Sequence, residues 1–175
     1  MTETLKETAQ EYEGGADRPL ASYGRILAVY GGAVGALTVV AKLTGRGAPE
    51  RIGPLDLALM GLFTHRMSRT LAKDTVLSPL RAPFTKYVGV SGPSELEEEV
   101  RGTGLRHAVG ELVSCPFCLS QWVAGAYAAG MVFAPRLTRL AGATMTAVTV
   151  SPPRGGFPRH RTACAVRQRG RTSSA

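Results

Sequence analysis

The residues of this chain best suited to chemistry are Cys115 and Cys118, which form a Cys-Pro-Phe-Cys motif directly before a long apolar stretch. Proline is favourable in the first turn of a helix because its missing N–H would have no partner there in any case. The motif therefore predicts a helix that begins at the cysteines, where free N–H groups and the helix dipole lower the pKa of a thiol. Thiol exchange and metal ligation both need such a thiolate.

The motif leaves three interpretations open: packing thiols without chemistry, redox thiols, and metal ligands. Glutaredoxin-type enzymes carry a Cys-Pro-aromatic-Cys motif after a buried β-strand, and the sequence before Cys115 predicts no such strand. Structural zinc takes four ligands, so Cys115 and Cys118 would need His65, His107 or Glu111 as well, or four thiolates shared across a dimer. Cys115 and Cys118 are thus candidate metal ligands, with zinc as the candidate cofactor. No triad, phosphate loop or carboxylate pair stands out, so we assign no catalytic or cofactor-binding residue, which leans against an enzyme.

Three apolar stretches must position this motif, and they predict transmembrane helices at about 26–43, 53–72 and 117–134. The first and third are almost free of charge, and each is short for a hydrocarbon core of about 30 Å. Flanking Arg and Lys side chains can reach the headgroups and compensate for that shortness. The second stretch becomes amphipathic, because Arg66, Arg69 and Lys73 share one helix face. The fold class predicted is all-α: a polytopic membrane domain over 23–150.

The apolar stretches owe their character to small side chains, since the chain has 21 Gly and only 6% aromatic residues. Ala28, Gly32 and Ala36 recur every four residues, a spacing that lets a second helix approach closely in lipid. We name these three residues the small-residue seam. The seam predicts a homo-oligomer or another helix partner, in addition to the lipid bilayer itself.

The segment between the second and third stretches predicts a basic connecting loop. Pro79, Pro83, Gly92 and Pro93 favour irregular structure, and Ser94 before a run of glutamates favours the start of a short, solvated helix. Seven Lys and Arg residues lie between Phe63 and Cys115. By the positive-inside rule this loop and the N-terminus are expected in the cytoplasm.

Both ends of the chain are polar. Residues 1–22 predict an acidic, solvated arm, whereas residues 151–175 contain Arg, Pro, Gly, Thr and Ser without any acid. We interpret 151–175 as a disordered tail whose composition is typical of a shifted reading frame in GC-rich DNA. The formal charge of +8 is concentrated in this tail. The tail has no aromatic interleaving beyond Phe157, so no nucleic-acid binding is expected.

Several blocks of sequence, in order, resemble a known bacterial family. They are residues 64–69, 73–76, 80–84, 102–106 and 110–122. Together they resemble the family called domain of unknown function 1360, over about residues 25–150. The resemblance implies a multi-pass protein of the bacterial cytoplasmic membrane without an assigned activity, and the chain departs from it after about Val150. We expect a structural or interaction role in that membrane; the alternative is a membrane thiol-redox or metal-binding protein that uses Cys115 and Cys118.

Overall fold

The computed structural model describes residues 7–8, 11–12, 19–49, 51–92 and 95–150. The tail predicted for 151–175, with its disorder and its reading frame, therefore lies outside the described residues. Most of the arm predicted for 1–22 lies outside them too.

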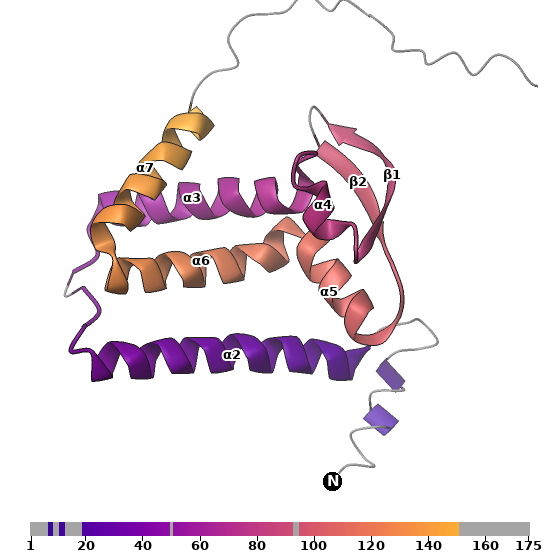
Figure 1. Ribbon diagram of the computed structural model, residues 1–175, viewed down its shortest axis with the longest axis horizontal. Coiled ribbons are helices and arrows are strands. Elements are labelled where there is room, and N and C mark those ends of the chain that lie inside the picture. The colour runs from indigo at the N-terminus through magenta and orange to yellow at the C-terminus, as the bar shows by residue number, and fades with distance from the viewer. Residues whose placement is uncertain (1–6, 9–10, 13–18, 50, 93–94, 151–175) are drawn as a thin grey trace, which may run out of the picture.

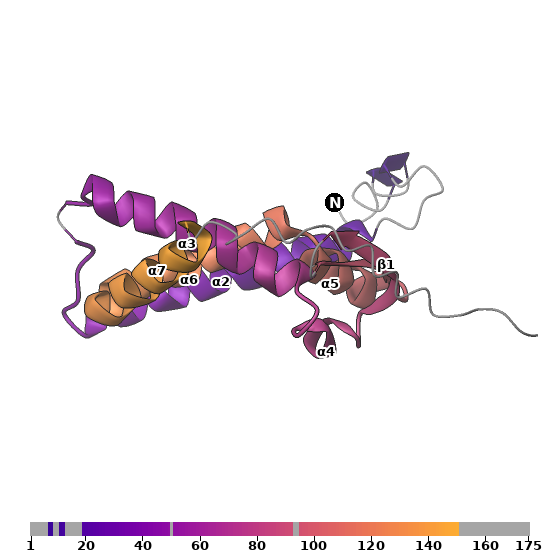
Figure 2. The ribbon, with the colours of Figure 1, turned by 90° about the horizontal axis from the view of Figure 1, so that it is seen from above.

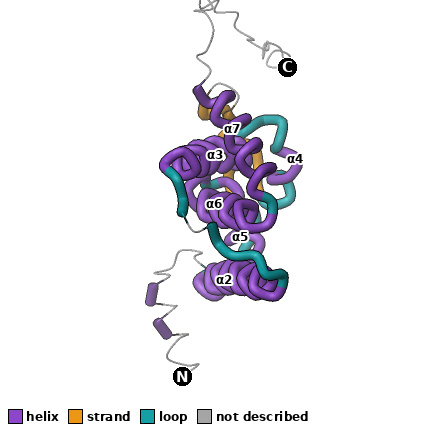
Figure 3. Tube along the Cα trace, turned by 90° about the vertical axis from the view of Figure 1, so that its left-hand side faces the viewer, coloured by secondary structure: helices purple, strands orange, loops and turns teal. Residues whose placement is uncertain are grey.

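Three long helices lie side by side and occupy the stretches predicted from the sequence. They are α2 (Leu20–Leu43), α3 (Pro54–Lys73) and α6 (Pro116–Phe133). Figures 1 and 3 show α6 in the middle, with α3 on one side of it and α2 on the other. The bounds differ from the predicted 26–43, 53–72 and 117–134 by one residue at most, except that α2 begins six residues earlier, at Leu20.

The three helices alternate in direction. Tyr23 near the start of α2 donates a hydrogen bond to Glu111 just before α6, and Arg46 beyond the end of α2 donates to the carbonyl of Phe133 at the end of α6. Asp56 at the start of α3 instead meets the segment that follows α6, through Arg139. Helices α2 and α6 are therefore parallel to each other, and α3, which lies between them in the sequence, is antiparallel to both.

The helix α7 (Pro135–Val150) crosses α3 at an angle (Figures 1 and 2). The crossing is close because Gly142 has no side chain: a Cβ there would lie 2.4 Å from the hydroxyl of Tyr127 and 3.3 Å from the Cβ of Leu59. Tyr127 is 3% exposed, and its ring centroid lies 5.0 Å from that of Phe63. The packed core of the bundle therefore lies between α3, α6 and α7, whereas α2 is held more loosely.

A β-hairpin covers one end of the bundle, which corrects two predictions. The short helix α4 (Ser78–Arg81) leads into β1 (Thr85–Gly92), which pairs antiparallel with β2 (Glu95–Val100). The predictions of an irregular loop and of a short helix after Ser94 were wrong. The all-α fold class is confirmed only as a mostly helical chain, which also carries this two-stranded sheet. Within β2, Leu96, Glu98 and Val100 turn inward while the glutamates between them stay exposed. This alternation is a strand period, and it prevailed over the helix propensity of glutamate.

We call this end of the molecule the hairpin end, and the end that holds Asp56 and Phe133 the far end. The helix α5 (Gly104–Ser114) returns from the hairpin to the cysteine motif. Figure 1 shows α4, α5 and the hairpin gathered at the same end, where α3 finishes and α6 begins.

Among the described helices, α2 alone is long and apolar enough to cross a membrane, and none of its most apolar 18 residues is buried. Helices α5 and α6 reach the same apolarity together, but they are bent by 79° at Cys115. The basic residues of α3 lower its hydropathy. Three spans are thus not established by length and composition, since one or two such helices also occur in soluble proteins and in signal sequences.

Candidate dithiol site

Cys115 and Cys118 sit at the first turn of α6, as the sequence predicts. Cys115 is the N-cap, Pro116 is the first helical residue, and the Cys115 Sγ accepts a hydrogen bond from the N–H of Cys118 at 3.4 Å. The sulfur takes the place that a serine or aspartate oxygen usually fills at a helix start. The N-cap role thus fixes the side chain of Cys115 over the free N–H groups of α6.

Both cysteines are free thiols, Cys115 half-buried and Cys118 exposed. Burial raises the pKa of Cys115, but hydrogen bonds from the Cys118 thiol and from the N–H groups of Phe117 and Cys118, with the positive charge of Lys73, outweigh it. The net pKa of Cys115 is below its usual value. A thiol in this position supplies more thiolate near neutral pH than a free cysteine does.

The bend between α5 and α6 holds the motif in place. The N–H of Cys115 donates to the carbonyl of Glu111 at 3.1 Å, so α5 ends directly at the N-cap of α6. Behind the bend, a Cβ at Gly110 would lie 2.5 Å from Cγ1 of Val100 and 2.9 Å from the carbonyl oxygen of Phe84. Glycine at 110 thus lets α5 press directly against the hairpin, which determines the angle at which the motif is presented.

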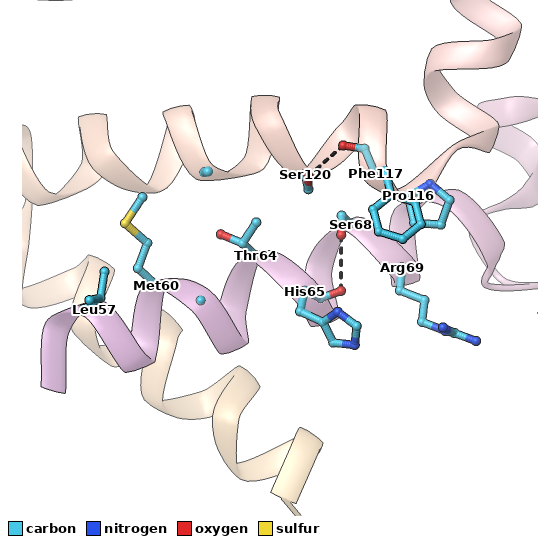
Figure 4. Close-up of a pocket in the computed structure, with 11 residues that line it drawn as sticks. Leu57, Met60, Thr64, His65, Ser68, Arg69, Pro116, Phe117 and Ser120 are labelled. Atoms are coloured by element: carbon cyan, nitrogen blue, oxygen red, sulfur yellow. Dashed lines mark hydrogen bonds between the residues drawn. The ribbon is translucent and has the colours of Figure 1, made fainter. Parts of the chain in front are cut away.

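On the side facing α3, the motif borders a groove of about 480 Å³. Figure 4 shows Pro116, Phe117, His65 and Arg69 at one end of it, and the aliphatic side chains of Leu57 and Met60 at the other. Phe117 is 88% exposed, so the residue between the cysteines projects from the surface. The groove therefore has polar side chains, His65 and Arg69, beside Pro116 and Phe117 at one end, and aliphatic side chains at the other.

On the side facing α2, Cys118 lines a second cavity, of about 270 Å³, with Tyr23, Glu111 and Trp122. Trp122 packs edge-on against Tyr30, with ring centroids 5.1 Å apart. Gln121 donates to the hydroxyl of Tyr30 at 3.0 Å. These contacts tie the first turns of α6 to α2, so the dithiol lies where α2, α5 and α6 meet.

The structure brings the two cysteines together but does not bring the two candidate histidines to them as a ligand set. His65 lines the groove beside Phe117, whereas His107 lies on α5, 3.3 Å from the carbonyl of Gly102 and 3.5 Å from the carboxylate of Glu111. In the part of the chain that the structure describes, no three His, Cys, Asp or Glu side chains cluster as a metal site would require. Metal ligation by Cys115 and Cys118 within one chain therefore gains no further ligand from these residues.

Arg81 is the central residue of the hairpin end, and the sequence analysis missed its role. Its guanidinium donates to Glu98 at 2.6 Å, to the carbonyl of Leu71 at 2.8 Å and to the carbonyl of Asp74 at 2.9 Å. It joins the end of α3 to β2 while being 2% exposed. The alternation of Leu96, Glu98 and Val100 is the signal that would have found its partner, because it places Glu98 on the apolar face of a strand.

The structure also gives Glu111 contacts that the sequence analysis did not propose. Its carboxylate accepts from Tyr23 on α2 and lies near His107 one turn earlier on α5. The spacing of four residues between His107 and Glu111 is a signal for the second contact. No local sequence pattern indicated the contact of Glu111 with Tyr23, because these residues lie 88 positions apart in the chain.

Comparison with known proteins gives a family and a relative. The sequence model of a family described as Protein of unknown function (DUF1360) matches residues 59–152. The chain is also similar to the Sporulation protein YjcA of Bacillus subtilis (strain 168), with 36% identity over 77 residues. That alignment covers 42% of this chain and 65% of the relative, so the chain spans slightly less than two thirds of the relative's length. No solved structure matches the chain.

Proposed function

The chain belongs to the family described as Protein of unknown function (DUF1360), and on that premise we propose that it is a multi-pass protein of the bacterial cytoplasmic membrane with a structural or interaction role. The observation that carries the proposal is the alternation of α2, α3 and α6 between two ends of the bundle. A chain that crosses a bilayer repeatedly must reverse direction at each crossing. The connection from α2 to α3 and the one from α3 to α6 both reverse the direction of the chain. Polar side chains lie at both ends of the bundle.

The surface of α2 supports the same proposal. Between Arg25 and Lys42 the helix carries no charge, and its side chains are exposed along most of its length. Leu27 is 70% exposed and Val39 55% exposed, on a helix that the rest of the chain barely covers. Such an apolar surface is costly in water and favourable in lipid.

The ends of the bundle differ in charge. The hairpin end carries Arg25 and the seven basic residues between Phe63 and Cys115, whereas the far end carries five, which are Lys42, Arg46, Arg51, Arg136 and Arg139. By the positive-inside rule the hairpin end faces the cytoplasm, and with it the start of α2 and the cysteine motif.

We further propose a helix partner, a second copy or another protein, on the small-residue seam of Ala28, Gly32 and Ala36. A Cβ built at Gly31, Gly32 or Gly35 meets nothing within 4 Å, so this face of α2 is open in the described chain. Backbones can approach closely where side chains are this small, and the resulting packing is what drives helix association in lipid.

Two measurements test the proposal. Expressed in a bacterium, the full chain should stay with the inner membrane after an alkaline wash. In a variant with all three native cysteines replaced by serine, Ala48→Cys at the far end should react with a membrane-impermeant maleimide in intact cells. The matched variant Thr103→Cys at the hairpin end should react only after permeabilisation. Recovery in the soluble fraction, or equal labelling of both sites in intact cells, would refute the proposal.

A second candidate function is thiol chemistry at Cys115 and Cys118, either redox exchange or zinc ligation. The specific observation in its favour is the Cys115 sulfur at the N-cap of α6, hydrogen-bonded by the Cys118 N–H at 3.4 Å. For zinc, two chains would each supply two thiolates, which makes a ratio of one metal to two chains the diagnostic result.

A further inference from the structure

We infer that Cys115 and Cys118 exchange with an organic disulfide, Cys115 as the attacking sulfur and Cys118 as the resolving one. The inference deepens the second candidate function and rests on it. It commits to redox exchange rather than metal binding and assigns a separate role to each sulfur.

The two sulfurs differ in their surroundings. Cys115 Sγ is fixed at the N-cap of α6, over the free N–H groups of Phe117 and Cys118. Those groups stabilise a negative charge on Cys115, whose sulfur caps the helix and accepts the N–H of Cys118 at 3.4 Å. The thiolate is the reactive form in exchange, so Cys115 is the sulfur that starts the reaction.

Cys118 is placed to complete the reaction. It lies on the same helix turn as Cys115, and its backbone N–H donates a hydrogen bond to the Cys115 sulfur at 3.4 Å. Cys118 also lines the cavity on the α2 side, with Glu111 and Trp122. Cys118 is therefore close enough to attack a mixed disulfide formed on Cys115.

The surroundings admit a disulfide substrate. Phe117 stands 88% exposed between the cysteines, and the adjoining groove of about 480 Å³ changes from polar to apolar along its length. Pro116 and Phe117 line this groove, and Cys118 beside them is exposed, so a disulfide whose apolar flank lies in the groove would meet the motif at Phe117. The group that reacts is an S–S bond, and it can belong either to a small molecule or to a polypeptide.

The exchange is balanced as follows. The Cys115 thiolate attacks one sulfur of R–S–S–R′, forming Cys115–S–S–R and releasing R′–S⁻, which takes a proton from water. Cys118 then loses its proton to water and attacks the Cys115 sulfur, which forms the Cys115–Cys118 disulfide and releases R–S⁻. The substrate gains two electrons and the dithiol loses two. Small thiols of the cytoplasm then reduce the protein disulfide by the same exchange in reverse.

The test uses the full chain in detergent, with Cys164→Ser to remove the third thiol. The probes are oxidised glutathione and a synthetic peptide with one internal disulfide and an apolar flank, and the products are followed by intact mass. With Cys115 and Cys118 present, the protein should lose two hydrogens and retain no probe. Cys118→Ser should retain the probe on Cys115, and Cys115→Ser should react at least about tenfold more slowly. A peptide that reacts faster than glutathione identifies a polypeptide substrate, and the reverse order identifies a small molecule.

The inference is overturned if Cys115→Ser reacts as fast as Cys118→Ser, if the unsubstituted pair keeps the probe, or if the purified protein holds one zinc for every two chains. Membrane association is measured on the same cells before extraction. The double variant Cys115→Ser, Cys118→Ser should stay in the membrane, so failure of the exchange is distinguished from failure of the membrane assignment.

Discussion

The guanidinium of Arg81 and the carboxylate of Glu98 form an ion pair of 2.6 Å whose side chains are only 2% and 5% exposed. Because Arg81 also donates to the carbonyls of Leu71 and Asp74, this pair fastens the hairpin to the end of α3. Removing one partner of a buried pair leaves the other charge without compensation in a poorly solvated place. The hairpin end should therefore be sensitive to this one carboxylate.

Glu98→Gln should lower the free energy of unfolding by about 3–5 kcal/mol, because Arg81 stays charged and buried. Denaturant unfolding in detergent measures the change. Glu97→Gln is the matched control, since Glu97 lies on the exposed face of the same strand and should change stability by less than about 0.5 kcal/mol. Equal effects of the two changes would contradict the buried pair.

Arg69 on α3 donates two hydrogen bonds to the carboxylate of Glu95 on β2, at 2.6 and 2.9 Å, and this contact predicts a pH dependence. The hydrogen bond from Arg69 outweighs burial and lowers the pKa of Glu95 below its ordinary value. Because the pKa of Glu95 is lower in the folded chain than in the unfolded chain, where it is about 4.3, the ionised carboxylate stabilises the fold above that value. This stabilisation is lost as the pH falls through the folded-state pKa. Arg69→Gln should therefore be less stable than the unsubstituted chain at pH 7, with the difference vanishing at lower pH. A difference that grew with acid would oppose this assignment.

The close approach of α5 to the hairpin predicts a sharp glycine requirement. Gly110→Ala would place a Cβ 2.5 Å from Val100, and it should destabilise the protein by about 1–3 kcal/mol. Gly35→Ala, on α2, meets nothing within 4 Å, so it should be neutral or stabilising through helix propensity. Thermal unfolding of the two variants side by side provides the comparison. If Gly110→Ala is as stable as Gly35→Ala, α5 does not press on β2 as described.

The small-residue seam can be tested by association. A Cβ at Gly32 meets nothing within 4 Å in the described chain, so a larger side chain there points to the face proposed for another molecule. We expect Gly32→Leu to reduce cross-linked dimer or partner capture in membranes, because the larger side chain separates two backbones that must touch. Leu37→Ala, at a residue 41% exposed on the same helix, should leave association unchanged. Identical cross-linking for both variants would remove the seam as an interface.

The sequence by itself determined the long helices and the place of the thiols. Charge-free stretches bounded by Arg, Lys, Gly and Pro predicted α2 and α6, and α3 was predicted despite its basic second half. The local chemistry of Cys-Pro-Phe-Cys located the start of α6, because a proline at the first helical position and a capping residue before it act within one turn. Such features depend on neighbours a few residues apart, so they are visible without a fold.

Only the tertiary structure decided how these helices are joined. The glutamates of 95–99 suggested a helix from local propensity. They form a strand instead, because Glu98 pairs with the buried Arg81 and Val100 packs against α5 at Gly110. The pairing of Asp56 with Arg139, at 2.7 Å, and of Tyr23 with Glu111 spans more than 80 residues in each case. Contacts of that sequence separation leave no periodicity in the chain, because they depend on how the elements pack and not on the order in which they occur.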